Sequence, residues 1–265
     1  MRYGVISDIH ANLHALDAVL GVLSRVGVDD VLCAGDLVGY GPMPNECVAR
    51  IAALGARCVA GNHDLIALRR LSDADCSELA QDSLRWTRHE LSRDSYRYLD
   101  RLPPMLTTAD GVVVAHGSLE SPAEYVRDAD QRCEQLELLE RTHPGARVLV
   151  LGHTHRRVAH GAHAGTVRPR WGGSLSLTRS DRYLLNHGSV GQSRERAARA
   201  RFIVLDLDRS RATYYGVGYD LEGCRQALRE RGLPTWSAHL NPSALSRAAR
   251  LLRRAAAARI AMRRR

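Results

Sequence analysis

The sequence contains no lysine, a single phenylalanine and no long apolar run. Its longest apolar stretches, such as residues 148–151, are far shorter than the roughly 20 residues that a membrane-spanning helix needs. The first residues follow a strand-like pattern and lack the charged and apolar segments of a secretory signal. We therefore expect a cytoplasmic protein without a membrane span.

Cysteine is sparse, and its spacing excludes a thiolate-bound structural zinc. The six cysteines are scattered along the chain and form no C-x-x-C pair. A chain of 265 residues buries enough apolar surface to fold without disulfide bonds. We expect reduced thiols that serve mainly in packing.

The net charge of +9 comes almost wholly from the end of the chain. Residues 242–265 contain eight arginines and no acidic residue, which leaves 30 arginines against 29 acidic residues in the rest. We predict one domain over residues 1–241 and an Arg/Ala-rich helical extension over residues 242–265. The extension is amphipathic, so we expect it to pack on the domain, with nucleic acid or an anionic surface as the alternative partner.

Apolar runs alternate with helical periodicity along most of the domain, which predicts parallel strands covered by helices. The predicted strands cover residues 3–6, 31–34, 57–60, 112–115, 148–151, 183–185, 202–207 and 212–217. The predicted helices cover residues 13–23, 47–54, two segments within 73–102, 130–142 and 221–231. The last two strands are joined by a short turn and should form a hairpin.

Polar side chains directly follow five of these strands. In chain order they are Asp8 and His10; Asp36; Asn62, His63 and Asp64; His116; and His153 with His155. The loops beyond the carboxyl ends of strands converge on one crevice in open α/β sheets, so these residues should lie together there. A lone histidine after a strand is more often a hydrogen-bonded loop residue than a ligand. Five such sets, most of them flanked by glycine, favour a shared site.

The residue types indicate which ligand this site binds. Carboxylates, imidazoles and one amide suit a divalent metal such as Mn²⁺, Fe²⁺, Zn²⁺ or Co²⁺. Seven candidate ligands exceed what one ion takes, whereas two ions sharing a bridging carboxylate, about 3.5–4 Å apart, would use them all.

The five sets resemble the motifs of the calcineurin-like metallophosphoesterase superfamily. The motifs D-x-H, G-D-x-x, G-N-H-D, a lone H and G-H-x-H occur in this order over residues 1–217. Longer stretches at residues 7–12, 35–42 and 116–125 are similar to small bacterial members described as predicted phosphodiesterases. The resemblance implies an α/β fold, a four-layer α/β/β/α sandwich of two mixed sheets flanked by helices.

The resemblance also implies a role for each residue of the motifs. One metal would be held by Asp8, His10, Asp36 and His155, and the other by Asp36, Asn62, His116 and His153. His63 would face the substrate as a catalytic residue, with Asp64 orienting its ring. We expect two divalent ions, Mn²⁺ in the first place, with Fe²⁺, Zn²⁺, Co²⁺ or Ni²⁺ as alternatives.

These roles imply hydrolysis of a small phosphate ester by attack of a bridging hydroxide. The resemblance favours a nucleotide-derived phosphodiester, although phosphomonoesters, cyclic nucleotides and dinucleoside polyphosphates use the same chemistry. The alternative is a non-catalytic metal-binding scaffold in a protein assembly, but such relatives lack the catalytic histidine, and His63 is present. A nucleic-acid-binding module has only the basic tail in its favour.

Two further segments are candidate substrate contacts. Many relatives carry N-P-G-S where this chain has Asn186, His187, Gly188 and Ser189. We expect Asn186 to contact the substrate, and His187 either to alter that contact or to face solvent. Arg156 follows the last histidine pair and, with Arg157, either contacts a substrate phosphate or forms a solvated pair.

Overall fold

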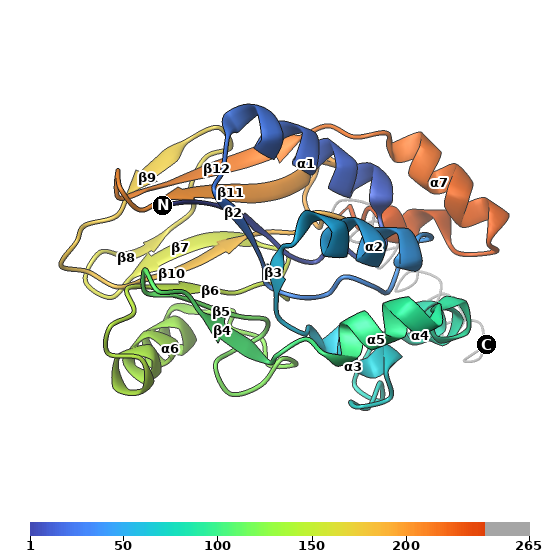
Figure 1. Ribbon diagram of the computed structural model, residues 1–265, viewed down its shortest axis with the longest axis horizontal. Helices are drawn as coiled ribbons and strands as arrows, with labels where there is room; N and C mark the ends of the chain where they lie inside the picture. Colours follow the sequence, from blue (N-terminus) through green and yellow to red (C-terminus); the bar gives the residue numbers. More distant parts are fainter. Residues whose placement is uncertain (242–265) are drawn as a thin grey trace, which may run out of the picture.

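A computed structural model describes residues 1–241 of the chain. Two six-stranded sheets pack face to face between two layers of helices (Figure 1). Both sheets contain parallel and antiparallel pairs, so the predicted α/β/β/α sandwich of mixed sheets is confirmed.

The first sheet, sheet A, is built from the two ends of the described chain. Its strand order is β3 (Arg57–Cys58), β2 (Asp30–Cys33), β1 (Arg2–Ile6), β11 (Ala200–Asp206), β12 (Arg211–Val217) and β9 (Ser174–Ser176). The strands β1, β2 and β3 are parallel, and β1 pairs with β11 in antiparallel register. The predicted hairpin is the β11–β12 pair.

Sheet B contains the middle of the chain. Its strand order is β4 (Met105–Thr107), β5 (Val112–Ala115), β6 (Val148–Val150), β10 (Tyr183–His187), β7 (Arg157–Gly161) and β8 (Gly165–Val167). The strands β5, β6 and β10 are parallel. Each sheet therefore has three parallel strands, whose carboxyl ends carry the polar sets identified in the sequence.

Helices cover the outer face of each sheet (Figure 1). Sheet A is covered by α1 (Leu13–Val26), which contacts β11 and also packs on α2 (Pro44–Leu54) and α7 (Leu221–Glu230). Sheet B is covered by α6 (Ala129–Thr142), below β4 and β5 in the figure. The helices α3 (Asn62–Ala67), α4 (Glu78–Glu90) and α5 (Arg93–Asp100) pack together beside the sheets, and a 3₁₀ turn spans Thr235–Ala238.

The apolar residues form three layers that match this architecture. Alternate residues of β1 and β11 face different layers: Tyr3, Val5 and Ile203 lie between the sheets, whereas Ile6 and Phe202 face the helices on sheet A. A third layer joins sheet B to α6. Because both faces of these strands are buried, the strands have continuous apolar sequences instead of alternating ones.

Several short elements were not predicted from the sequence. They are α3, β4, β7, β8 and β9, each of six residues or fewer. The edge strands β4, β8 and β9 have three residues each and are too short for a period-two pattern, so only tertiary pairing defines them. The two helices predicted within residues 73–102 are confirmed and separate at Ser92, whose side chain caps α5.

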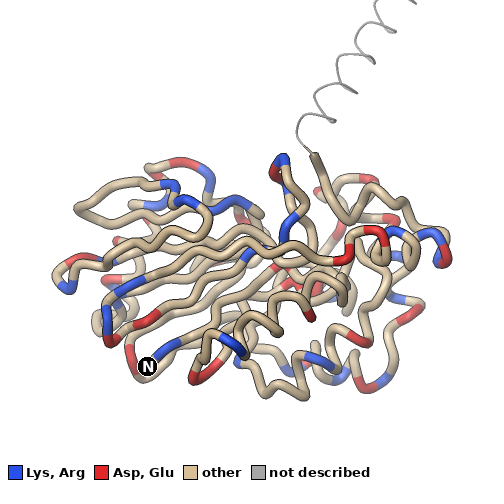
Figure 2. Tube along the Cα trace, turned by 90° about the horizontal axis from the view of Figure 1, so that it is seen from above, with Lys and Arg blue, Asp and Glu red and all other residues tan. Residues whose placement is uncertain are grey.

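The described part of the chain is nearly neutral, with arginine and acidic residues interspersed along it (Figure 2). Its helices are all too short or too polar to cross a lipid bilayer. All six cysteines are free, and four of them are buried. The predicted helical extension at residues 242–265 lies outside the described residues.

One side chain joins the two sheets by a hydrogen bond. The hydroxyl of Tyr214 in β12 donates to the carbonyl of Val158 in β7, with an O···O distance of 3.0 Å, and the tyrosine is fully buried. We expect Tyr214→Phe to lower the free energy of unfolding by about 1 kcal/mol, measured by urea denaturation. The control is Tyr215→Phe, on the opposite face of β12 and half-buried, which should change the free energy of unfolding much less. Equal losses in both variants would contradict a specific inter-sheet bond.

Candidate metal centre

The seven candidate ligands come together where the two sheets end. They are all buried, with exposed fractions between 0 and 6%. Three groups of ligand atoms each lie within 4.8 Å of one another: Asp8, His10 and His155; His10, Asp36 and His63; and Asp36, His116 and His153. The structure therefore places in one crevice the side chains that the sequence pattern expected there.

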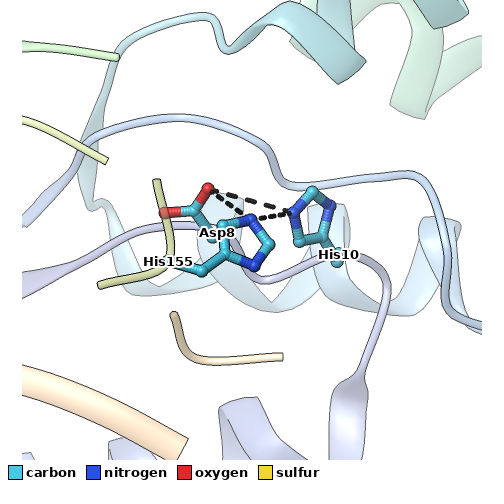
Figure 3. A group of neighbouring side chains, drawn as sticks. All are labelled: Asp8, His10 and His155. Carbon is cyan, nitrogen blue, oxygen red and sulfur yellow. Dashed lines mark hydrogen bonds and ion pairs between the residues drawn. The ribbon is translucent and has the colours of Figure 1, made fainter. Parts of the chain in front are cut away.

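The first group consists of Asp8, His10 and His155, which point toward one another (Figure 3). The Nε2 atom of His155 lies 3.1 Å from Oδ1 of Asp8 and 3.0 Å from Nε2 of His10. The Nε2 atom of His10 is 3.9 Å from the same carboxylate oxygen. Three potential ligand atoms thus surround a single point.

Asp36 connects this group to the second one. Its Oδ2 atom lies 3.6 Å from Nε2 of His10 and 3.2 Å from Nε2 of His116. The same His116 nitrogen is 3.0 Å from Oδ1 of Asn62. The ring of His153 lies beside that of His116, with centroids 5.1 Å apart. Asp36 therefore occupies the position of a carboxylate shared by two sites.

Each of the four histidines has one ring nitrogen bound to a backbone carbonyl. The bonds, of 2.6–3.1 Å, join Nδ1 of His10 to Val38, Nδ1 of His155 to Gln192, Nδ1 of His116 to Ala34 and Nε2 of His153 to Ala123. A carbonyl oxygen only accepts, so these nitrogens carry the protons. The remaining nitrogen of each neutral ring is an acceptor, and such support by a backbone carbonyl is typical of histidines that bind metal.

This arrangement fits a cation in both halves of the centre. Burial lowers the pKa of His10 and of His155, so both rings are neutral and direct lone pairs at each other across 3.0 Å. The acceptor nitrogen of His116 likewise faces oxygen atoms of Asp36 and Asn62. Facing acceptors repel unless a positive species lies between them.

The pKa of His116 shows how strongly the neighbouring carboxylate of Asp36 acts on this ring. Burial alone would lower the pKa, but the charge of Asp36 and its hydrogen bond outweigh burial and raise the pKa of His116 to about 9. At neutral pH the Nε2 atom of His116 therefore carries a proton. Burial, followed by the charge of His116, lowers the pKa of His153 to about 3.

The backbone around the ligands is held in an unusual conformation. Asp8, His10, Asp36, His153 and His155 all have φ between +49° and +62°, in the left-handed region. Non-glycine residues adopt this region rarely and at a cost in free energy, and such strain concentrates at functional sites. The strain here turns successive side chains of each short loop into the same crevice.

A glycine permits the close approach of two ligand loops. A Cβ atom on Gly61 would overlap both the side chain and the backbone nitrogen of Asp36. Only glycine therefore lets the loop after β3 pack directly on the loop after β2.

Asp64 has a different role from the one predicted. Its carboxylate accepts backbone N–H groups from Asp36, Leu37, Val38 and Gly61, at 2.9–3.2 Å. No hydrogen bond joins it to the ring of His63 within residues 1–241, so the prediction that Asp64 orients this ring is wrong. Burial and the charge of Asp36 raise the pKa of Asp64 to about 7, against the four N–H groups, which favour the carboxylate. Asp64 ties the Asp36 loop to the start of α3.

His63 is buried in the candidate centre beside two other rings. Its ring centroid is 4.8 Å from that of His10 and 4.7 Å from that of Tyr40. Its Nδ1 atom has no hydrogen-bond partner among the described residues. Burial lowers the pKa of His63 to about 4; the charge of Asp36 opposes this effect, and the charges of His116 and Arg194 add to it. The ring is therefore neutral at neutral pH.

The end of β10 supports the loop that carries His153. The amide of Asn186 is buried and donates to the Gly152 carbonyl at 2.6 Å and to the Thr154 hydroxyl at 3.2 Å. Both donated bonds hold the loop that carries His153, which corrects the expectation that Asn186 contacts substrate. His187 is fully buried, so the expectation that it faces solvent is wrong, and neither ring nitrogen has a partner among residues 1–241.

Three other side chains belong to this region but were not singled out in the sequence. They are Tyr40, Tyr125 and Arg194. Tyr40 is buried against His10 and His63, and the ring of Tyr125 stacks on that of His153 with centroids 3.8 Å apart. The glycines on both sides of Tyr40 were the one local signal for it. Arg156 is exposed on the wall of a neighbouring cavity, as discussed below.

Comparison with known proteins agrees with the geometry. A family model described as the calcineurin-like phosphoesterase superfamily domain matches residues 1–210. A crystal structure of a metallophosphoesterase from Sphaerobacter thermophilus is 34% identical, with a TM-score of 0.77, over 90% of this chain and 96% of that one. A hypothetical protein from Pyrococcus horikoshii shares the fold at 19% identity, with a TM-score of 0.73 over 89% and 96% of the two chains. An uncharacterised protein of Methanocaldococcus jannaschii is 29% identical over 242 residues, which cover 88% of this chain and 93% of that one.

The carboxylate of Asp64 accepts four backbone N–H groups, so replacing it tests how the candidate centre is supported. We expect Asp64→Asn to lower the free energy of unfolding by about 2–4 kcal/mol, because an amide oxygen replaces only part of a carboxylate that accepts four bonds. Divalent-metal affinity should fall by about 10–100-fold, since the Asp36 loop loses its support. Urea denaturation and calorimetric titration with Mn²⁺ measure the two effects.

The matched control is Asp181→Asn. Asp181 is also buried and accepts backbone N–H groups, from His163, Ala164 and Arg182, but it lies outside the metal-binding groups. This variant should lose stability and keep its metal affinity. Unchanged metal affinity in Asp64→Asn would contradict the assigned support.

Proposed function

The chain belongs to the calcineurin-like phosphoesterase superfamily, and on this premise we propose that it hydrolyses a phosphate ester at a centre of two divalent metal ions. The observation that carries the proposal is that Asp36 connects two buried ligand groups: it belongs to one with His116 and His153, and it lies 3.6 Å from His10 of the other, which also contains Asp8 and His155. Neither group alone has enough donors for a centre of two ions, whereas together with Asn62 they offer seven.

The ligands divide between the two ions as the sequence resemblance implies. Asp8, His10 and His155 would hold one ion, and His116, His153 and Asn62 would hold the other. Asp36 contributes to both, in keeping with its position between His10 and His116. The donors are nitrogen and oxygen atoms without thiolate, which favours Mn²⁺, with Fe²⁺, Zn²⁺, Co²⁺ and Ni²⁺ as alternatives.

When bound, two such ions supply a hydroxide nucleophile at neutral pH and neutralise the phosphoryl oxygens. The protein contributes a preorganised cage for this chemistry. The backbone carbonyls on the four histidine rings fix which nitrogen points inward, and all four rings are buried.

His63 acts on the substrate. Its ring is neutral at neutral pH in the free site and still carries one N–H, which donates to an oxygen of the ester. The negative charge of a bound phosphate raises the pKa of this ring, so that a full proton becomes available to the leaving oxygen. Tyr40 packs against the ring and holds its orientation.

The substrate class is a phosphodiester, by resemblance to the family, with phosphomonoesters as the alternative. The test is a screen of p-nitrophenyl phosphate, bis-p-nitrophenyl phosphate, cyclic nucleotides and diadenosine tetraphosphate with added Mn²⁺, combined with elemental analysis. We expect close to two ions per chain and the highest kcat/KM on a diester. Asp36→Asn should lose metal and activity together, because it removes the shared carboxylate. Full metal content without activity toward any ester would favour the non-catalytic scaffold.

The role of His63 separates catalysis from metal binding. We expect His63→Ala to keep the metal content of the wild type and to lower kcat by roughly 10²–10⁴-fold, the usual contribution of a positioned proton donor. Elemental analysis and steady-state kinetics on the best substrate of the screen measure the two quantities.

His160→Ala is the control for this variant, since His160 is a buried histidine of β7 that bonds to Thr166 and lies outside the metal-binding groups. It should keep both metal and activity. Loss of metal in His63→Ala would instead make His63 a ligand, in line with its place beside His10 and Asp36.

A further inference from the structure

A cavity of about 530 Å³ lies beside the candidate metal centre. Its wall is formed by the segment before α6, the start of β7, the end of β8 and the loop after β10. Six arginines line it: Arg127, Arg132, Arg156, Arg157, Arg168 and Arg194. The volume falls within the range of small-molecule sites.

The cavity shares its wall with the metal ligands. Tyr125 lines the cavity, and its ring stacks on that of the ligand His153 at 3.8 Å. On the other side, the Gln192 carbonyl accepts from His155, while its side-chain oxygen accepts from Arg194 at 3.3 Å. Thr154 and Arg156 on the cavity wall are the direct sequence neighbours of the candidate ligands His153 and His155, so the cavity lies next to the candidate centre.

The arginines of the cavity are largely without counter-charges. Glu195 is the one acidic residue on the wall, and it pairs with Arg157 at 2.5 Å and with Arg201 at 2.7 Å. The other five cavity arginines make no ion pair within residues 1–241. The guanidinium of Arg127 lies over the ring of Tyr125, and Nε of the buried Arg132 has no hydrogen-bond partner among these residues.

This concentration of charge differs from the rest of the described chain, in which arginines and acidic residues almost balance. Like charges gathered on one wall repel, and a bound polyanion relieves that repulsion. Guanidinium groups also match phosphate oxygens in charge and in hydrogen-bond geometry. A single monoanionic group would use one or two of these arginines and leave the others unpaired.

We propose that the cavity binds a second phosphate group of the substrate, so that the substrate is a phosphate ester carrying at least one further phosphate. This inference rests on the proposed function for the position of the scissile ester. The metal centre binds the phosphate whose ester bond is hydrolysed, and the arginines bind the second phosphate, which does not react. Selection among phosphate esters thus depends on the cavity and not on the metal ligands.

The kinetic test compares phosphodiesters that differ by one phosphate: 5′-phosphorylated dithymidine monophosphate against dithymidine monophosphate. We expect wild-type kcat/KM to be at least about tenfold higher for the substrate with two phosphates. In Arg156→Ala and Arg168→Ala this ratio should fall toward one. Neither arginine makes an ion pair within the described chain and both are exposed, so neither substitution removes a folding contact of this kind.

The control variant is Arg170→Ala. Arg170 is exposed, lies two residues beyond Arg168 and does not line the cavity. It should keep the wild-type ratio. Equal kcat/KM for substrates with one and two phosphates, or an unchanged ratio in the two cavity variants, would overturn the proposal.

A binding measurement separates this proposal from the proposed function. Calorimetric titration of the metal-loaded protein with inorganic tripolyphosphate and with inorganic phosphate requires no hydrolysis. We expect tripolyphosphate to bind at least about tenfold more tightly, and Arg156→Ala and Arg168→Ala to lose this advantage while Arg170→Ala keeps it. Equal affinity for the two anions would refute the cavity as a phosphate site even in an active enzyme. Preferential binding by a protein that hydrolyses no ester would support the cavity and contradict the phosphoesterase.

Discussion

The structure depends on one constraint: two carboxylates and several imidazole rings are held close together at the candidate centre, where they are buried from water. Asp8 and Asp36 are almost completely buried, and each has a carboxylate oxygen 3.1–3.2 Å from the Nε2 atom of a histidine. Such a set is unfavourable without a positive species between its members, because burial strengthens repulsion and removes compensating water. The fold must therefore hold these groups in place by contacts that do not involve the metal-facing atoms.

Those contacts come almost entirely from the backbone. Carbonyl groups accept from the outer nitrogen of each histidine ring, and backbone N–H groups converge on Asp64. Left-handed backbone at five ligands turns their side chains inward, and the absence of a side chain on Gly61 lets two loops touch. Parallel strands in both sheets bring these loops to the same edge, which makes the architecture suitable for a shared centre.

In the proposed function, the centre and the cavity beside it have different roles. The centre holds the phosphate that reacts, and the arginine wall selects substrates that carry a further phosphate. The wall is built from residues far apart in sequence, such as Arg127, Arg156 and Arg194, that meet only in the folded chain.

The residue pattern by itself predicted parallel strands covered by helices and the side chains that gather at the candidate centre, and the family resemblance added the two mixed sheets. Strands buried on both faces leave continuous apolar runs, and metal ligands leave carboxylate and imidazole residues directly after them, so both signals are local. Edge strands of a few residues carry no such pattern and appeared only through pairing. Only the tertiary structure decided that Asp64 binds backbone instead of His63, that Asn186 supports a loop, that His187 is buried, and that the arginines meet in one cavity. These outcomes depend on which distant segments come into contact, and no local pattern records that choice.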